Sequence, residues 1–121
     1  MKKEERACQL WSLLVFAATN RQTLTYGLVA KLIGAPAAAI GGWLEPIQSY
    51  CLINGLPALT VLIVSGSTGE PGEGFVGCVV KDVPHEQQRV FAFDWLHRDA
   101  PSPDVLRKAV EELPSNGVRI G

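Results

Sequence analysis

The chain has 121 residues, of which 47% are hydrophobic and 19% are charged, which is enough apolar material to fill the core of one domain over residues 1–121. Its 11 basic and 12 acidic residues give a formal net charge of −1, so overall charge does not drive it onto nucleic acid or an anionic membrane. The apolar runs are too short to cross a bilayer, and three widely spaced cysteines match no zinc motif. We therefore expect a cytoplasmic protein with buried thiols and no metal, cofactor or membrane partner.

The first half of the sequence predicts helices. Residues 4–19 carry an apolar stripe at helical spacing, made of Cys8, Trp11, Leu14, Val15 and Ala18. A second helix is expected from a capping threonine, Thr23 or Thr25, to a stop at Gly34. Its predicted buried residues are Leu28, Val29, Leu32 and Ile33. A third helix is expected over residues 36–44, and Pro46 is expected to restart a short fourth one that ends at Asn54-Gly55.

The second half changes period. Residues 59–64 are β-branched and continuously apolar, which favours a buried strand, and residues 75–80 form a similar run after a glycine-rich turn. Together they predict a β-hairpin. Two further helices are expected at 84–97 and 102–113. The predicted fold class is α+β, a winged-helix-like helix-turn-helix with a β-hairpin and extra C-terminal helices.

The segment from Thr25 to Pro36, TYGLVAKLIGAP, followed by IGG, resembles the DNA-binding domain of the alkylguanine-DNA alkyltransferases and the alkyltransferase-like proteins. The matching residues are Thr25, Tyr26, Gly27, Ala30, Ile33, Gly34, Pro36, Ile40, Gly41 and Gly42. A proline at position 57, the glycine loop up to Gly74 and the Trp95-Leu96 pair follow in the family's order. The resemblance covers about residues 10–75 and implies a helix-turn-helix that binds double-stranded DNA.

The departures from the family bear on chemistry. Alkyl transfer requires a cysteine thiolate activated by a histidine. The matching positions in this chain are Ala58 and Leu59, so we expect no enzyme activity. The family's arginine, which takes the place of the flipped base, falls within Ala37–Ala39, where this chain has only alanine. The resemblance therefore implies a non-enzymatic DNA-binding module.

The candidate DNA-binding residues lie in and before the two central helices. In the family, a helix of small residues enters the minor groove, and a tyrosine that matches Tyr26 contacts the DNA backbone. Small side chains permit close approach to sugars and phosphates, whereas hydroxyl and cationic side chains hold phosphates. The candidates are Arg21, Thr23, Thr25, Tyr26, Lys31, Ala37, Ala38 and Ala39.

Three alternatives remain open. Alanines and glycines in the third helix also suit plain close packing inside a core. The third helix begins with a run of small residues within Ala37–Gly42, which we call the small-residue arm. The scarcity of cations, with Glu45 following this arm, favours a protein-interaction module, such as a homodimer, over a strong DNA binder. A small-ligand pocket between the hairpin and the terminal helices is a third hypothesis.

Overall fold

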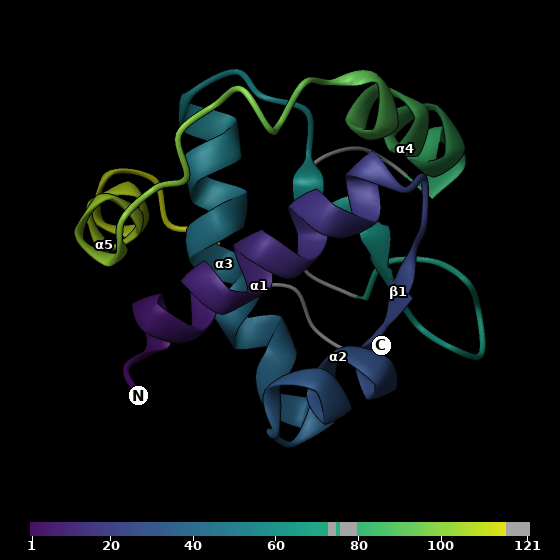
Figure 1. Cartoon of the computed structure of the whole chain (residues 1–121), viewed down its shortest axis with the longest axis horizontal. Coiled ribbons are helices and arrows are strands. Elements are labelled where there is room, and N and C mark those ends of the chain that lie inside the picture. Colours follow the sequence, from purple (N-terminus) through teal and green to yellow (C-terminus); the bar gives the residue numbers. More distant parts are fainter. Residues whose placement is uncertain (73–74, 76–79, 116–121) are drawn as a thin grey trace.

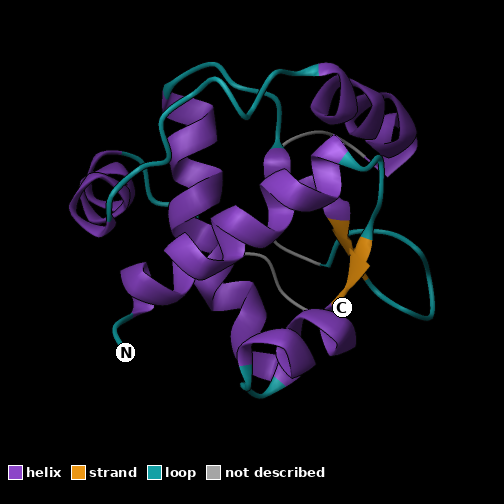
Figure 2. Ribbon diagram, in the orientation of Figure 1, coloured by secondary structure: helices purple, strands orange, loops and turns teal. Residues whose placement is uncertain are grey.

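The computed structural model describes residues 1–72, 75 and 80–115. The described α-helices are α1 (Lys3–Thr19), α2 (Tyr26–Ile33), α3 (Ala37–Ile53), α4 (Val83–Ala92) and α5 (Pro103–Glu112). Two short strands, β1 (Leu24–Thr25) and β2 (Ile63–Val64), pair in parallel, and two 3-10 helices, η1 (Leu59–Leu62) and η2 (Val80–Asp82), precede β2 and α4. The described part of the chain is therefore mostly helical with a small sheet, as an α+β fold class requires (Figure 1 and Figure 2).

The core forms where α1 crosses α3. In Figure 1, α5 packs beside α3 at the left, and the two strands lie at the right beside the end of α1. The largest fully buried side chains of this crossing are Leu10, Leu14, Ile40, Leu44 and Ile47. The predicted stripe of α1 is buried apart from Cys8, which is partly exposed. The helical period of residues 4–19 therefore identified the core face of α1 correctly.

Local signals set the ends of α1 and α2. The Thr25 hydroxyl oxygen accepts the N–H of Leu28 at 3.1 Å, so Thr25 is the cap of the two threonines that the sequence offered, and Gly34 ends α2 with φ of 67°, which confirms the predicted stop. Arg21 follows α1 with φ of 55°, a left-handed conformation that is uncommon outside glycine. This turn lets two N–H groups bond back to carbonyl groups in the last turn of α1, and it directs the chain into β1.

The third and fourth predicted helices are one continuous helix. α3 runs through Pro46, so the predicted restart at that residue is wrong. Proline inside a helix leaves the carbonyl four residues earlier without its usual donor, and here that carbonyl belongs to the exposed Gly42. Burial of Leu44 and Ile47 on either side of the proline favours a single helix. α2 and α3 meet at 91° across the turn of residues 34–36.

The predicted strand over residues 59–64 is wrong in its first four residues. Residues 59–62 form η1, and only Ile63 and Val64 are extended. All six side chains are buried, and a short run that is buried on every side has no period by which sequence separates strand from helix. The partner of β2 is β1, in parallel. Residues 76–79 of the predicted second strand lie outside the described residues, and Val80 begins η2.

The predicted helix over 84–97 ends early, at Ala92. Trp95 turns inward instead. Its ring nitrogen donates to the carbonyl of Val90 at 2.8 Å, and its ring meets that of Trp11 edge-on at 5.7 Å. This packing outweighs the helical preference of the segment.

Within the described residues, no single helix has the length and apolarity to cross a membrane; α2 and α3 pass that test only as a bent pair, by length and composition.

Candidate nucleic-acid interface

The structure places the predicted site residues on α2 and the first turn of α3, in the lower part of the view in Figure 1, and on the segment that runs down from the end of α1 through β1 at the right. Ala37 and Ala39 are partly buried, and Tyr26 is buried. The remaining predicted residues are exposed, together with neighbours that the sequence did not single out. We call this exposed set the α2–α3 surface: Arg21, Thr23, Thr25, Gly27, Leu28, Lys31, Leu32, Ala38 and Gly42.

Tyr26 does not belong to that surface. Its side chain is 4% exposed, and its hydroxyl oxygen accepts the N–H of Gly72 at 3.1 Å. Burial raises the pKa of this phenol, and the hydrogen bond from Gly72 opposes part of that rise. The Tyr26 side chain is therefore not exposed for the expected contact with a DNA backbone. The helical position of Tyr26 was predictable, but the long-range bond to Gly72 has no local sequence signal.

The small-residue arm of α3 has an inner and an outer side. Ile40 and Gly41 face the core, whereas Ala38 and Gly42 are exposed one turn apart. Beyond its own stretch of helix, a Cβ atom built on Gly42 would meet no atom of the described residues within 4 Å, and the same holds for Gly27 on α2. Neither residue needs a backbone conformation reserved for glycine. Internal packing therefore accounts for Gly41 but not for Gly27 or Gly42.

Few of the cations near this surface are available to a partner. Lys31 is exposed at the end of α2, and the Arg21 guanidinium lies 5.9 Å from the centre of the Phe91 ring. Arg6 instead donates to the carbonyl of Ile33 at 2.8 Å and so satisfies the C-terminal end of α2. The surface therefore offers two exposed cations of its own.

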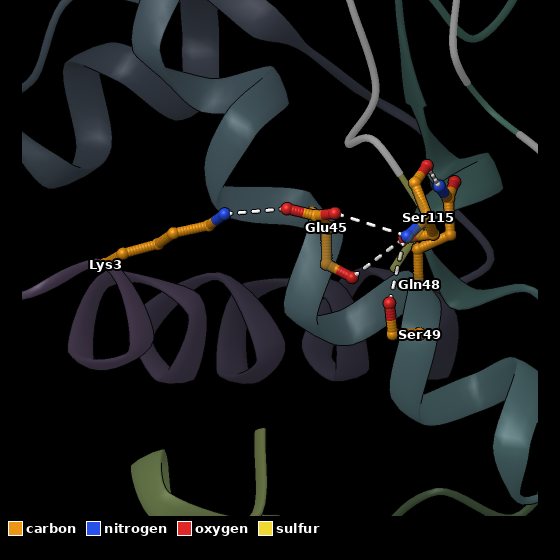
Figure 3. A network of polar contacts seen from close by, with 5 residues as sticks. All are labelled: Lys3, Glu45, Gln48, Ser49 and Ser115. Atoms are coloured by element: carbon orange, nitrogen blue, oxygen red, sulfur yellow. Dashed lines mark hydrogen bonds and ion pairs between the residues drawn. The ribbon is translucent and has the colours of Figure 1, made fainter. Parts of the chain in front are cut away.

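Glu45 is held away from solvent by a polar network that joins α1, α3 and the segment after α5 (Figure 3). Its carboxylate accepts from Lys3 Nζ at 2.7 Å and from the N–H of Ser115 at 3.2 Å. The hydroxyl of Ser115 donates to the Glu45 carbonyl and accepts from Ser49, and the Gln48 amide donates to the Ser115 carbonyl. The Glu45 carboxylate, which follows the small-residue arm in the sequence, is therefore paired with Lys3, and the Glu45 side chain is 14% exposed.

The outer side of α2 is more apolar than predicted. Leu28 and Leu32, which we expected to be buried, are 45% and 56% exposed. They lie four residues apart and so form one ridge along the helix. Eight residues make α2 barely two turns long, and Val29 with Ala30 supplies its buried side. The apolar residues of α2 therefore extend around more of the helix than the side that packs against the core.

The position that matches the family cysteine holds no reactive group. The N–H of Ala58 donates to the buried carboxylate of Glu86 at 2.8 Å, and Arg89 donates to the other oxygen of that carboxylate at 2.6 Å. Cys51 lies in the core, where burial raises the pKa of its thiol to about 12. A thiol with such a pKa is a poor nucleophile near neutral pH. Across the described residues, no three His, Cys, Asp or Glu side chains gather as metal ligands would.

A separate open pocket of about 340 Å³ lies between α3 and α5. It is lined by Tyr50, Ile53, Asn54, Val105, Lys108, Ala109 and Glu112.

Comparisons of this chain with protein-family models, with curated proteins and with solved structures found no match.

Proposed function

We propose that this chain is a non-enzymatic DNA-binding module that presents its α2–α3 surface to double-stranded DNA. Two observations support the assignment at the level of architecture. α2 and α3 are joined by three residues and meet at 91°, which lies within the range of DNA-binding helix-turn-helix pairs. The segment that forms them is the one that resembles the alkyltransferase-like DNA-binding domains.

The observation that carries the proposal is the open space above Gly27 and Gly42. Glycine inside a helix is less favourable than alanine by roughly 0.5–1 kcal/mol. Nothing in the described chain would collide with an alanine at either position. Gly27 and Gly42 are both exposed, and no contact among the described residues requires glycine at either position, which supports a partner that approaches the backbone closely there.

The chemistry of the surface sets the mode of binding. The outer side of the arm, Ala38 and Gly42, carries no hydrogen-bonding side chain, so it has nothing with which to distinguish base edges. Arg21 and Lys31 supply charge for phosphates, and the hydroxyls of Thr23 and Thr25 lie on the same surface. Two or three phosphate contacts give weak binding, with affinity falling by about 10- to 40-fold between 50 and 200 mM salt.

A salt series tests this proposal directly. We expect fluorescence anisotropy with a labelled duplex to give a log–log salt slope of about −2 to −3, and Lys31→Ala to make it shallower by about 0.9. Arg21→Ala should act similarly. Lys108→Ala on α5 removes an equal charge from another part of the molecule and should leave the slope unchanged. Equal slopes for all three variants would show that the α2–α3 surface is not the binding face.

The exposed leucine ridge favours a second function, a protein-interaction module that forms a homodimer. Leu28 and Leu32 together would bury apolar area against a partner chain, and such exposed pairs are typical of contact sites. This alternative predicts a mass in light scattering that rises with concentration and falls back to the monomer in Leu32→Ser. A constant monomer mass over the accessible concentration range would exclude it.

A further inference from the structure

The loop after β2 is fastened at both of its ends to the residues at the start of α2. At its start, Val64 pairs with Thr25, and a Cβ on Gly66 would lie 3.9 Å from the Thr25 methyl group. At its end, the N–H of Gly72 donates to the buried hydroxyl of Tyr26. The loop residues Ser65–Gly72 therefore border the first turn of α2, where the proposed DNA contacts begin.

Backbone bonds inside this loop bring Glu70 back to its base. The N–H of Ser65 donates to the carbonyl of Glu70 at 2.8 Å, and the N–H of Gly69 donates to the carbonyl of Ser65 at 2.8 Å. Because Ser65 directly follows Val64, the backbone of Glu70 lies one residue from the strand that pairs with Thr25. Glu70 is exposed, and no ion pair within the described residues involves it.

We propose that Tyr26 is a positioning residue that, through Gly72, holds the loop bearing the exposed Glu70 at the edge of the α2–α3 surface, where the negative charge of Glu70 weakens the binding of DNA. This inference rests on the proposed DNA-binding function. A carboxylate held near phosphates repels them, and the repulsion is largest at low salt. Tyr26 acts here without touching the nucleic acid, in contrast to the role that the family resemblance implies for it.

A double-mutant cycle measured by anisotropy tests the coupling. Glu70→Gln in the native background should tighten duplex binding by about two- to fivefold at low salt, with the gain fading as salt screens the charge. Tyr26→Phe keeps the buried ring but removes the acceptor of the Gly72 N–H. In that background the Gly72 end of the loop loses its tether, and if that tether positions Glu70, Glu70→Gln should change affinity by less than about 1.5-fold. Glu112→Gln on α5 is the matched charge control and should have no effect.

Amide hydrogen exchange separates the two parts of the inference. Tyr26→Phe should speed exchange at Gly72 by at least about tenfold, whereas buried amides of α1 such as that of Leu14 follow only the change in global stability. An equal gain from Glu70→Gln in both backgrounds would overturn the role of Tyr26, and so would unchanged exchange at Gly72. Loss of binding on Tyr26→Phe alone would indicate direct contact with DNA. If no variant binds a duplex, the proposed function fails and the electrostatic effect with it, while the exchange data still decide whether Tyr26 anchors the loop.

Discussion

Replacing Gly42 with alanine should change stability and DNA affinity in opposite directions. The new methyl group enters open space, because beyond its own stretch of helix no atom of the described residues lies within 4 Å of it, and alanine is the better helix former. The free energy of unfolding should therefore rise by roughly 0.5–1 kcal/mol, which corresponds to a melting temperature about 2–6 °C higher in a chain of this size. On the proposed surface the same methyl group keeps the helix backbone away from the sugar–phosphate chain. We expect affinity for a duplex to fall about tenfold, or roughly 1.4 kcal/mol.

Urea unfolding and fluorescence anisotropy measure the two quantities on the same preparation. Gly55→Ala is a useful control, because Gly55 also has free space around it but has φ of 64°, where alanine is strained. That variant should lose stability and, once folded, bind DNA as before. Undiminished affinity in Gly42→Ala would refute close approach at the arm, and a loss of stability would refute the open environment assigned to Gly42. Gly27→Ala should repeat the Gly42 result on α2.

Three further predictions concern the interior. Glu86→Ala should destabilise the fold by about 1–3 kcal/mol in urea unfolding, because it leaves the partly buried Ala58 N–H without its acceptor, while Glu86→Gln keeps an acceptor and should cost less. Ser115→Ala should cost about 1–3 kcal/mol by leaving the buried Ser49 hydroxyl without its acceptor, and a change below about 0.5 kcal/mol would show that the network of Figure 3 contributes little. The pKa of the Cys51 thiol is raised from 9.0 to about 12, so the folded state holds its proton longer than the unfolded state. Stability from this group is complete below pH 9 and lost between pH 9 and 12, and a Cys51→Ala variant should lack that alkaline component in a pH series of urea midpoints.

Features decided within a few residues were predictable from sequence. The Thr25 cap, the Gly34 stop and the core stripe of α1 each depend on neighbours in the same helix. So does the break between α2 and α3, where glycine and proline stand two residues apart. These signals established the order of helices and located the pair that carries the α2–α3 surface.

Features decided by distant contacts were not predictable. α4 ends early because the ring of Trp95 packs against Trp11 on α1. Glu45 is shielded from solvent by its hydrogen bond with Ser115, 70 residues away. The sequence predicted that a new helix begins at Pro46, because the cost of proline inside a helix is a local property. The core packing that offsets this cost involves distant residues and cannot be read from the sequence. The burial of Tyr26 belongs to the same class, since Gly72 lies 46 residues along the chain.

The small-residue arm shows how a single composition can serve two purposes. Gly41 is buried on the core side of α3, whereas its neighbour Gly42 is exposed and has open space beside it among the described residues. The leucine ridge of α2 lies on the same exposed side as Gly27 and Lys31, so a protein partner that covers Leu28 would also cover the proposed DNA contacts of that helix. The two functions we propose therefore exclude one another on a given molecule. Lys31→Ala should weaken only DNA binding, Leu32→Ser should weaken only self-association, and duplex DNA should dissociate any dimer that the ridge forms.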